Sequence, residues 1–133
     1  MMKRLLRHAL ILASMCVVGA VHAHHSGAMF DDTKVIEVTG VVKEFQYTNP
    51  HSWLLVDVTN SDGNVTTWGF EAEGPSTLMR AGIRKGDLPP GTPITIRGNP
   101  MKDGRSGSAW IDAVVNGETI NPRNGFAVNP AAE

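Results

Sequence analysis

VTTWGFEAEGPSTLMRAGI, residues 65–83, changes its hydrophobic period half-way along, and this change decides the fold. Residues 65–72 alternate apolar and polar side chains, as a half-buried strand does. Residues 74–83 have helical spacing instead, with an apolar side formed by Leu78, Met79 and Ala81. Ser76 is a suitable N-cap for this helix and Gly82 a suitable end. The segment therefore predicts one strand followed by one short helix.

Four further stretches have the alternation of strands: residues 34–47, 52–59, 94–100 and 109–116. Gly40 predicts a bulge or bend in the first of them, and the Asp-Gly pair in residues 60–64 predicts a hairpin. Five strands with a helix between the third and fourth follow the order of an OB-fold. We therefore expect an all-β chain with one short helix, folded as a five-stranded OB-fold-like Greek-key barrel. A β-sandwich or an open sheet with the same strand count is the alternative.

The first 23 residues have the features of a cleaved secretory signal peptide. Three basic residues precede an uncharged apolar segment, residues 9–20, which is short for a membrane span. Val21 and Ala23 are acceptable residues before a cleavage site, so we expect cleavage after Ala23. Cys16, the only cysteine, leaves with the signal. We therefore expect a periplasmic protein without a disulfide, and without stable membrane insertion after cleavage.

Cleavage leaves three parts: an N-terminal His-containing segment (24–33), the barrel domain (34–120) and a flexible C-terminal tail (121–133). The signal removes three of the 12 basic residues, which leaves nine against 13 acidic ones and a net charge near −4. This balance argues against nucleic acid or an anionic membrane as the partner. No nucleophile elbow, phosphate loop or zinc pattern is present, so we expect a protein that is not an enzyme.

The histidines predict a metal site. Cleavage gives His24 a free α-amino group, whose pKa is about 8 beside about 6.5 for its imidazole, so both nitrogens are available near neutral pH. His25 is adjacent, and His51 in the Asn-Pro-His turn is the remaining histidine of the mature chain. Amine and imidazole nitrogens favour copper as Cu(II), in the arrangement called a histidine brace, with zinc also possible. The predicted metal ligands are therefore His24, His25 and His51.

Several other side chains are open to a functional and a plain structural interpretation. Met29 and Met101 could be soft ligands for Cu(I), although methionines at a barrel rim more often pack. Glu71 and Glu73 share one face of the third strand, where we expect solvated strand-end charges rather than an acid–base pair. Trp53, Trp68 and Trp110 are expected to fill the barrel, although an aromatic ring near the site could instead shield Cu(I) by cation–π contact.

The leading hypothesis is carriage, sequestration or delivery of a metal ion, with a periplasmic or membrane-bound metal-handling protein as a possible partner. The alternative is an exported, non-enzymatic interaction module that binds a protein or a small ligand without metal. In that case the histidines would be contact residues on the same barrel face, or merely polar residues in a turn and at a terminus.

Residues 24–120 resemble the DUF6152 family of small exported bacterial proteins, whose function is undefined. The resemblance rests on HHS at residues 24–26, TGVVKEFQYTNPHSWL at 39–54, the WGFE and PSTLMRAGI motifs at 68–83, and LPPGTPITIRGNPMKDG at 88–104. It implies export and a compact β-rich domain, and it implies no activity.

Overall fold

The computed structural model describes residues 25–123 and 125–127. The predicted signal peptide, His24 and the last residues of the predicted tail therefore lie outside the described residues. Within them, five strands of the sheet form the barrel: β1 (Ile36–Gln46), β2 (Ser52–Thr59), β3 (Val65–Ala72), β4 (Pro93–Pro100) and β5 (Gly107–Val115). The helical elements are α2 (His25–Ala28), α3 (Pro75–Arg80) and the 3-10 turn η1 (Lys85–Asp87).

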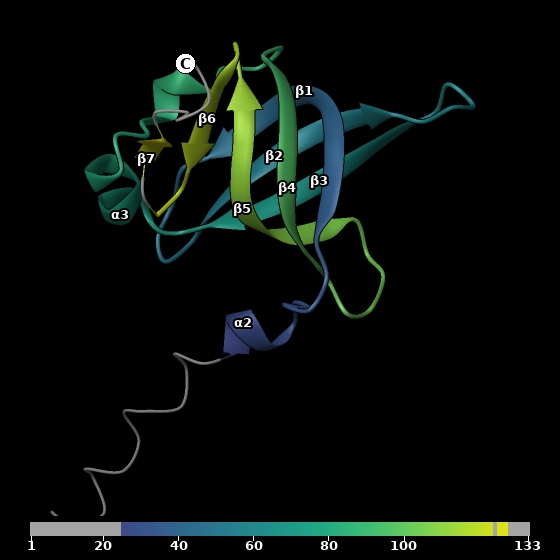
Figure 1. Ribbon diagram of the computed structural model, residues 1–133, viewed down its shortest axis with the longest axis horizontal. Helices are drawn as coiled ribbons and strands as arrows, with labels where there is room; N and C mark the ends of the chain where they lie inside the picture. Colours follow the sequence, from purple (N-terminus) through teal and green to yellow (C-terminus); the bar gives the residue numbers. More distant parts are fainter. Residues whose placement is uncertain (1–24, 124, 128–133) are drawn as a thin grey trace, which may run out of the picture.

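The five strands β1, β2, β3, β4 and β5 pair to form a closed barrel. β1 pairs in antiparallel fashion with both β2 and β4, and the antiparallel order continues to β3 on one side and β5 on the other. A parallel pairing of β3 with β5 joins the two ends of the sheet. α3 lies between β3 and β4 in the chain and packs at one end of the barrel (Figure 1). The predicted OB-fold-like barrel with one short α-helix between its third and fourth strands is confirmed.

The core lies inside the barrel because alternate residues of each strand point inward. β2 shows this most clearly, with Ser52, Leu54 and Val56 buried between half-buried neighbours. The fully buried side chains come from the strands and from the helical connection, and include Val42, Leu54, Phe70, Leu78, Ile83, Leu88, Ile96 and Ile120. Trp110 is 5% exposed, and the ring of Trp68 stacks on Phe70 with centroids 6.4 Å apart.

β1 bends at a different position from the one that the sequence predicts. Its register with β2 shifts between Val42 and Glu44, so the bulge lies beyond Gly40. Gly40 permits a close approach instead, because a Cβ at this position would collide with the carbonyl oxygen of Asp57 on β2. The glycine therefore lets two neighbouring strands lie close together.

The α3 helix also corrects two details of the prediction. Gly74 is the N-cap and Pro75 occupies the first turn, so the helix begins before Ser76, which is not its cap. Leu78 is fully buried, whereas Met79 is 56% exposed. Adjacent helical residues differ in direction by about 100°, and therefore only one of the two faces the barrel. Met79 is not a core residue.

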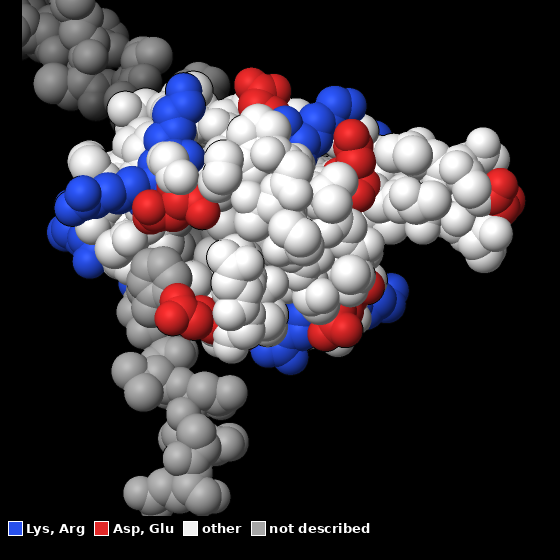
Figure 2. All heavy atoms as spheres, turned by 90° about the horizontal axis from the view of Figure 1, so that it is seen from above, with Lys and Arg blue, Asp and Glu red and all other residues white. Residues whose placement is uncertain are grey.

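Ordered structure continues past residue 120, where the sequence predicts a tail. β6 (Glu118–Asn121) pairs with β5, and β7 (Gly125–Ala127) pairs with β6. Pro122 in the turn between them is buried. On the face shown in Figure 2, basic and acidic side chains are interspersed around a largely uncharged centre. Among the residues described, no helix has the length and apolar character needed to cross a membrane.

Candidate functional site

The connection between β1 and β2, residues 47–51, places His51 at the edge of the barrel. The Thr48 hydroxyl donates to the His51 carbonyl oxygen at 3.2 Å, and the Ser52 hydroxyl donates to the Thr48 carbonyl oxygen at 3.4 Å. The peptide between Asn49 and Pro50 is cis. The turn packs tightly against Gly74, where a Cβ would stand 2.7 Å from the Pro50 carbonyl oxygen. The end of β3 therefore lies directly beside His51.

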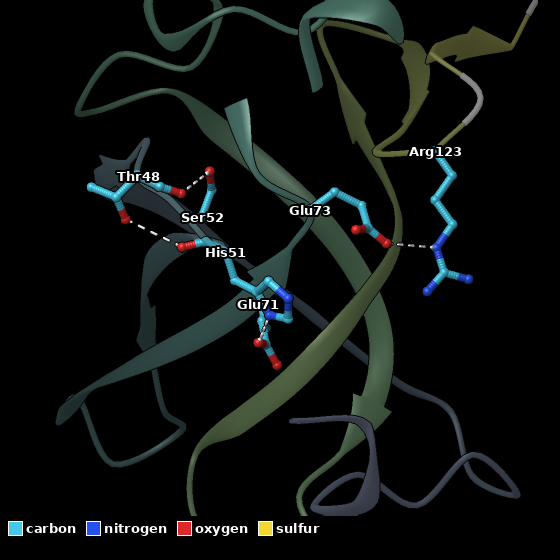
Figure 3. Close-up of polar contacts among 6 residues, drawn as sticks. All are labelled: Thr48, His51, Ser52, Glu71, Glu73 and Arg123. Carbon is cyan, nitrogen blue, oxygen red and sulfur yellow. Dashed lines mark hydrogen bonds and ion pairs between the residues drawn. The ribbon is translucent and has the colours of Figure 1, made fainter. Parts of the chain in front are cut away.

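The register of β2 and β3 brings a carboxylate to this histidine. Trp53 lies opposite Glu71, so Glu71 is diagonal to His51 on the outer face of the hairpin. His51 Nδ1 and Glu71 Oε1 are in direct hydrogen-bonding contact, and Figure 3 shows the two side chains turned toward each other. The side chain of Glu71 is 10% exposed and that of His51 is 36% exposed. The carboxylate is therefore mostly buried, while the imidazole keeps one edge accessible.

The pair faces a cavity of about 200 Å³. The cavity lies where β3 and β5 part, because their parallel pairing covers only Gly69–Glu71 on β3. Its polar lining consists of His51, Glu71, Glu73 and Arg123, and its apolar lining includes Phe30, Ala72, Trp110 and Pro122. It is therefore a partly apolar space with titratable and charged groups on one side.

Glu73 is the second carboxylate of the cavity. Its Oε1 pairs with Arg123 Nε at 3.3 Å, which ties the end of β3 to the turn between β6 and β7 (Figure 3). The side chains are 38% and 76% exposed, respectively. This pair is more accessible than the pair of His51 with Glu71.

The N-terminal segment reaches the same cavity, because Gly27 and Phe30 are among its lining residues. Phe30 forms an isolated antiparallel bridge with Met101 in the connection between β4 and β5. Lys102 adds two bonds: its backbone N–H donates to the Met29 carbonyl oxygen at 2.9 Å, and its Nζ donates to the Ala28 carbonyl oxygen at 3.0 Å. The chain that follows the predicted cleavage site is thus attached to the barrel beside His51.

The turn that follows this segment is stabilised by Asp31. Hydrogen bonds from Thr33 and the nearby ammonium group of Lys34 lower the pKa of Asp31 to about 2, from an ordinary value of 3.8. The Asp31 backbone N–H also donates to the Pro100 carbonyl oxygen at 2.8 Å. The charged carboxylate therefore fixes the path from the N-terminal segment into β1, rather than forming part of the cavity.

The structure describes the three predicted metal ligands to different extents. His51 lies in the cavity, and among the residues described no partner is found for its Nε2. His24 lies outside the described residues. His25 begins α2, two residues before the cavity-lining Gly27, and its side chain is not described. The described residues contain no group of three or more His, Cys, Asp or Glu side chains close enough to hold a metal ion.

The two methionines are not part of the cavity lining that the structure describes. Met101 packs across Gly107, where a Cβ would stand 2.8 Å from its Sδ. Met29 is 37% exposed. The sulfur of Met101 therefore has a packing role.

Sequence reasoning missed the role of Glu71, which we expected to be a solvated strand-end charge. The register of the β2–β3 hairpin could have revealed the contact of Glu71 with His51. Paired residues of β2 and β3 are equidistant from Asp62, from the pair Thr59–Val65 to the pair Ser52–Ala72. Extending this register places the end of β3 beside His51, where a mostly buried carboxylate pairs with the imidazole.

The aromatic residues support the site from outside and inside the barrel. On the outer face, the ring of Trp53 lies over Gly69, where a Cβ would stand 3.2 Å from the ring. Inside, Trp110 packs against Phe45 with ring centroids 6.3 Å apart. Its Nε1 is buried without a hydrogen-bond partner in the described part of the chain. Both rings therefore hold the strands that border the cavity.

A family model described as "Family of unknown function (DUF6152)" matches residues 12–110. No curated protein and no solved structure matches the chain significantly.

Proposed function

The chain belongs to the DUF6152 family, whose function is unknown, and from the cavity around His51 we propose that it binds a transition-metal ion, with copper the first candidate. The observation that carries this proposal is the direct hydrogen-bonding contact of His51 Nδ1 with Glu71 Oε1. Metal-binding histidines commonly donate their second ring N–H to a carboxylate, which fixes the tautomer and makes the ring a better ligand.

This pairing determines which nitrogen is free. When Nδ1 carries the proton and donates it to Glu71, Nε2 keeps its lone pair. The imidazole is 36% exposed and lines a cavity large enough for an ion and further ligands. His51 would therefore bind the metal through Nε2, with Glu71 as an outer partner that positions the ring.

The other ligands come from the N-terminal segment. His24 would supply its α-amino group and imidazole after cleavage at Ala23, and His25 is a further candidate. The attachment of residues 28–30 to the β4–β5 connection supports this assignment, because it holds Gly27 at the cavity that contains His51. Gly27 is only two positions from His25 and three from His24.

The donor set favours copper among the common ions. Amine and imidazole nitrogens bind divalent first-row metals in an order that peaks at Cu(II), and zinc is the next candidate. The proposed task is carriage, sequestration or delivery of the ion in the periplasm, together with a metal-handling partner. No catalytic role is proposed.

The test is a titration of three proteins with Cu(II) and Zn(II): one that begins at His24, one with a single glycine added ahead of His24, and His51→Ala in the first form. We expect the added glycine to weaken Cu(II) binding about 100-fold and His51→Ala to weaken it at least about tenfold. Gln46→Ala, an exposed substitution on β1, is the control and should bind as the unaltered protein does.

Equal affinity of the glycine-extended form would contradict a role for the terminal amine. If neither ion binds the unaltered protein below about micromolar, the metal proposal fails, and the exported interaction module becomes the better hypothesis.

A further inference from the structure

The cavity around His51 contains two carboxylates that have different partners. Glu71 is mostly buried and paired with His51, whereas Glu73 is 38% exposed and has a single ion pair, at 3.3 Å, with the exposed Arg123. Exposed pairs of this kind contribute little free energy to stability. Glu73 can therefore leave Arg123 for a stronger cation at little cost.

Glu73 lines the same cavity as Glu71. It directly follows β3, in which Glu71 lies, and both residues line the cavity with His51. Figure 3 shows the carboxylate of Glu73 between the imidazole and the Arg123 guanidinium. His51, Glu71 and Glu73 do not form a ready three-residue metal group as they stand, so Glu73 would reach an ion at His51 Nε2 by leaving Arg123 and turning toward the imidazole.

The described lining of the cavity contains no soft donor. The thioether of Met101 packs on Gly107, and neither Met101 nor Met29 is among the lining residues. Cu(I) prefers thioether and thiolate sulfur, whereas carboxylate oxygen and imidazole nitrogen suit divalent ions. In addition, a dication balances the charges of Glu71 and Glu73, which a monocation does not.

We infer that the bound ion is divalent, and that Glu73 becomes a ligand by exchanging Arg123 for it. This inference rests on the proposed function and specifies the oxidation state and one further ligand. Arg123 then acts as the counter-ion of Glu73 in the metal-free protein. The site selects Cu(II), or another divalent ion of similar chemistry, against Cu(I).

The experiment compares Cu(II) and Cu(I) affinities of proteins that begin at His24. Cu(II) is measured by competition with a chromophoric chelator, and Cu(I) by competition with a Cu(I)-specific chelator under anaerobic, reducing conditions. We expect Cu(II) to bind at least about tenfold more tightly than Cu(I). Glu73→Gln should weaken Cu(II) binding about tenfold and change Cu(I) binding less than about twofold.

Three variants serve as controls. Glu44→Gln removes an exposed carboxylate of β1 that does not line the cavity, and should leave Cu(II) affinity unchanged. Arg123→Gln breaks the same ion pair but keeps Glu73, so it should leave Cu(II) binding equal or tighter. Met101→Leu should leave Cu(I) binding unchanged. The Ser52 N–H bonds the backbone oxygen of Glu73 at 3.3 Å, so that contact persists in Glu73→Gln.

The inference is overturned if Cu(I) binds more tightly than Cu(II), if Glu73→Gln binds Cu(II) as the unaltered protein does, or if Arg123→Gln weakens Cu(II) as much as Glu73→Gln. Each of these outcomes, combined with binding that depends on His51, leaves the proposed function standing. Absence of any metal binding overturns both.

Discussion

The connection from Tyr47 to His51 joins two regions of different chemistry: the end of the barrel closed by α3, and the cavity where β3 and β5 part. At the closed end the Tyr47 hydroxyl lies between the carbonyl oxygens of Pro75 and Ile83, at 3.1 and 2.9 Å. At the cavity, His51 pairs with the carboxylate of Glu71. The five-residue turn thus ends in the hydroxyl bonds of Tyr47 on one side and in the contact of His51 with the Glu71 carboxylate on the other.

This difference indicates that stability depends mainly on the closed end of the barrel, whereas binding would depend on the cavity. The closed end is filled by side chains without charge, such as Leu78, Ile83 and Leu88, each at most 2% exposed. Burial of these groups stabilises the fold and leaves no free donor or acceptor for a ligand. The cavity instead is lined by the side chains of His51, Glu71, Glu73 and Arg123. Changes at the first region should therefore alter unfolding, and changes at the second should alter binding.

Leu78→Ala should have the largest effect, and it should fall on stability alone. Removing this fully buried side chain should lower the free energy of unfolding by about 3 kcal/mol, measured by denaturant titration. The affinity of the folded protein for Cu(II) should stay the same. Met79→Ala on the same helix is the control, and it should change stability by less than about 0.5 kcal/mol because Met79 is 56% exposed. An equal loss of unfolding free energy in Leu78→Ala and Met79→Ala would contradict the role of the buried core in stability.

Glu71→Gln should alter Cu(II) binding rather than the stability of the fold. The amide keeps an acceptor for His51 Nδ1 but loses the charge that strengthens the imidazole as a ligand, so Cu(II) affinity should fall about tenfold. The matched control is Asp112→Asn, which alters the carboxylate that forms two bonds with Arg97 across β4 and β5. A loss of Cu(II) affinity in Asp112→Asn would show that general surface charge, and not the pair with His51, controls binding.

Tyr47→Phe should have the smallest effect. Loss of the hydroxyl bonds should cost about 1 kcal/mol of unfolding free energy at neutral pH. Burial, with a contribution from Asp87, raises the pKa of Tyr47 above its ordinary value of 10.0. Since the folded protein holds this proton more tightly than the unfolded chain, the stabilisation is complete below pH 10 and is lost as the pH rises through the folded pKa.

The difference in stability between Tyr47→Phe and the unaltered protein should therefore narrow in unfolding titrations above pH 10. If the difference in stability stayed constant above pH 10, the pKa of the Tyr47 hydroxyl would be the same in the folded and unfolded protein.

Much of the barrel was predictable because its strands are amphipathic. β2 and β3 have the predicted bounds, and β1, β4 and β5 differ from theirs by one or two residues. α3 was placed correctly in the order of elements, but its start was not, because Gly74 and Pro75 replace the side-chain cap that Ser76 would provide. β7 was missed since it is three residues long and depends on pairing with β6.

The candidate site was less predictable because it depends on contacts between distant segments. His51 was identified from its isolation in the sequence, but its partner Glu71 follows only from the register of the hairpin. Arg123 reaches Glu73 through the β6–β7 turn, 50 residues further along the chain. Periodicity identifies the face of each strand, and it contains no information about which strands meet where a barrel closes.

The parallel pairing of β3 with β5 has a consequence for exchange with solvent. It spans Gly69–Glu71 on β3, whereas β2 and β3 pair over eight residues each. A short seam opens by local fluctuation at a lower free energy than a long ladder does, without global unfolding. The amides at this seam should therefore exchange their hydrogens faster than those in the middle of β2. Since Glu71 is the last residue of the seam, each opening also loosens the strand end that carries the carboxylate partner of His51.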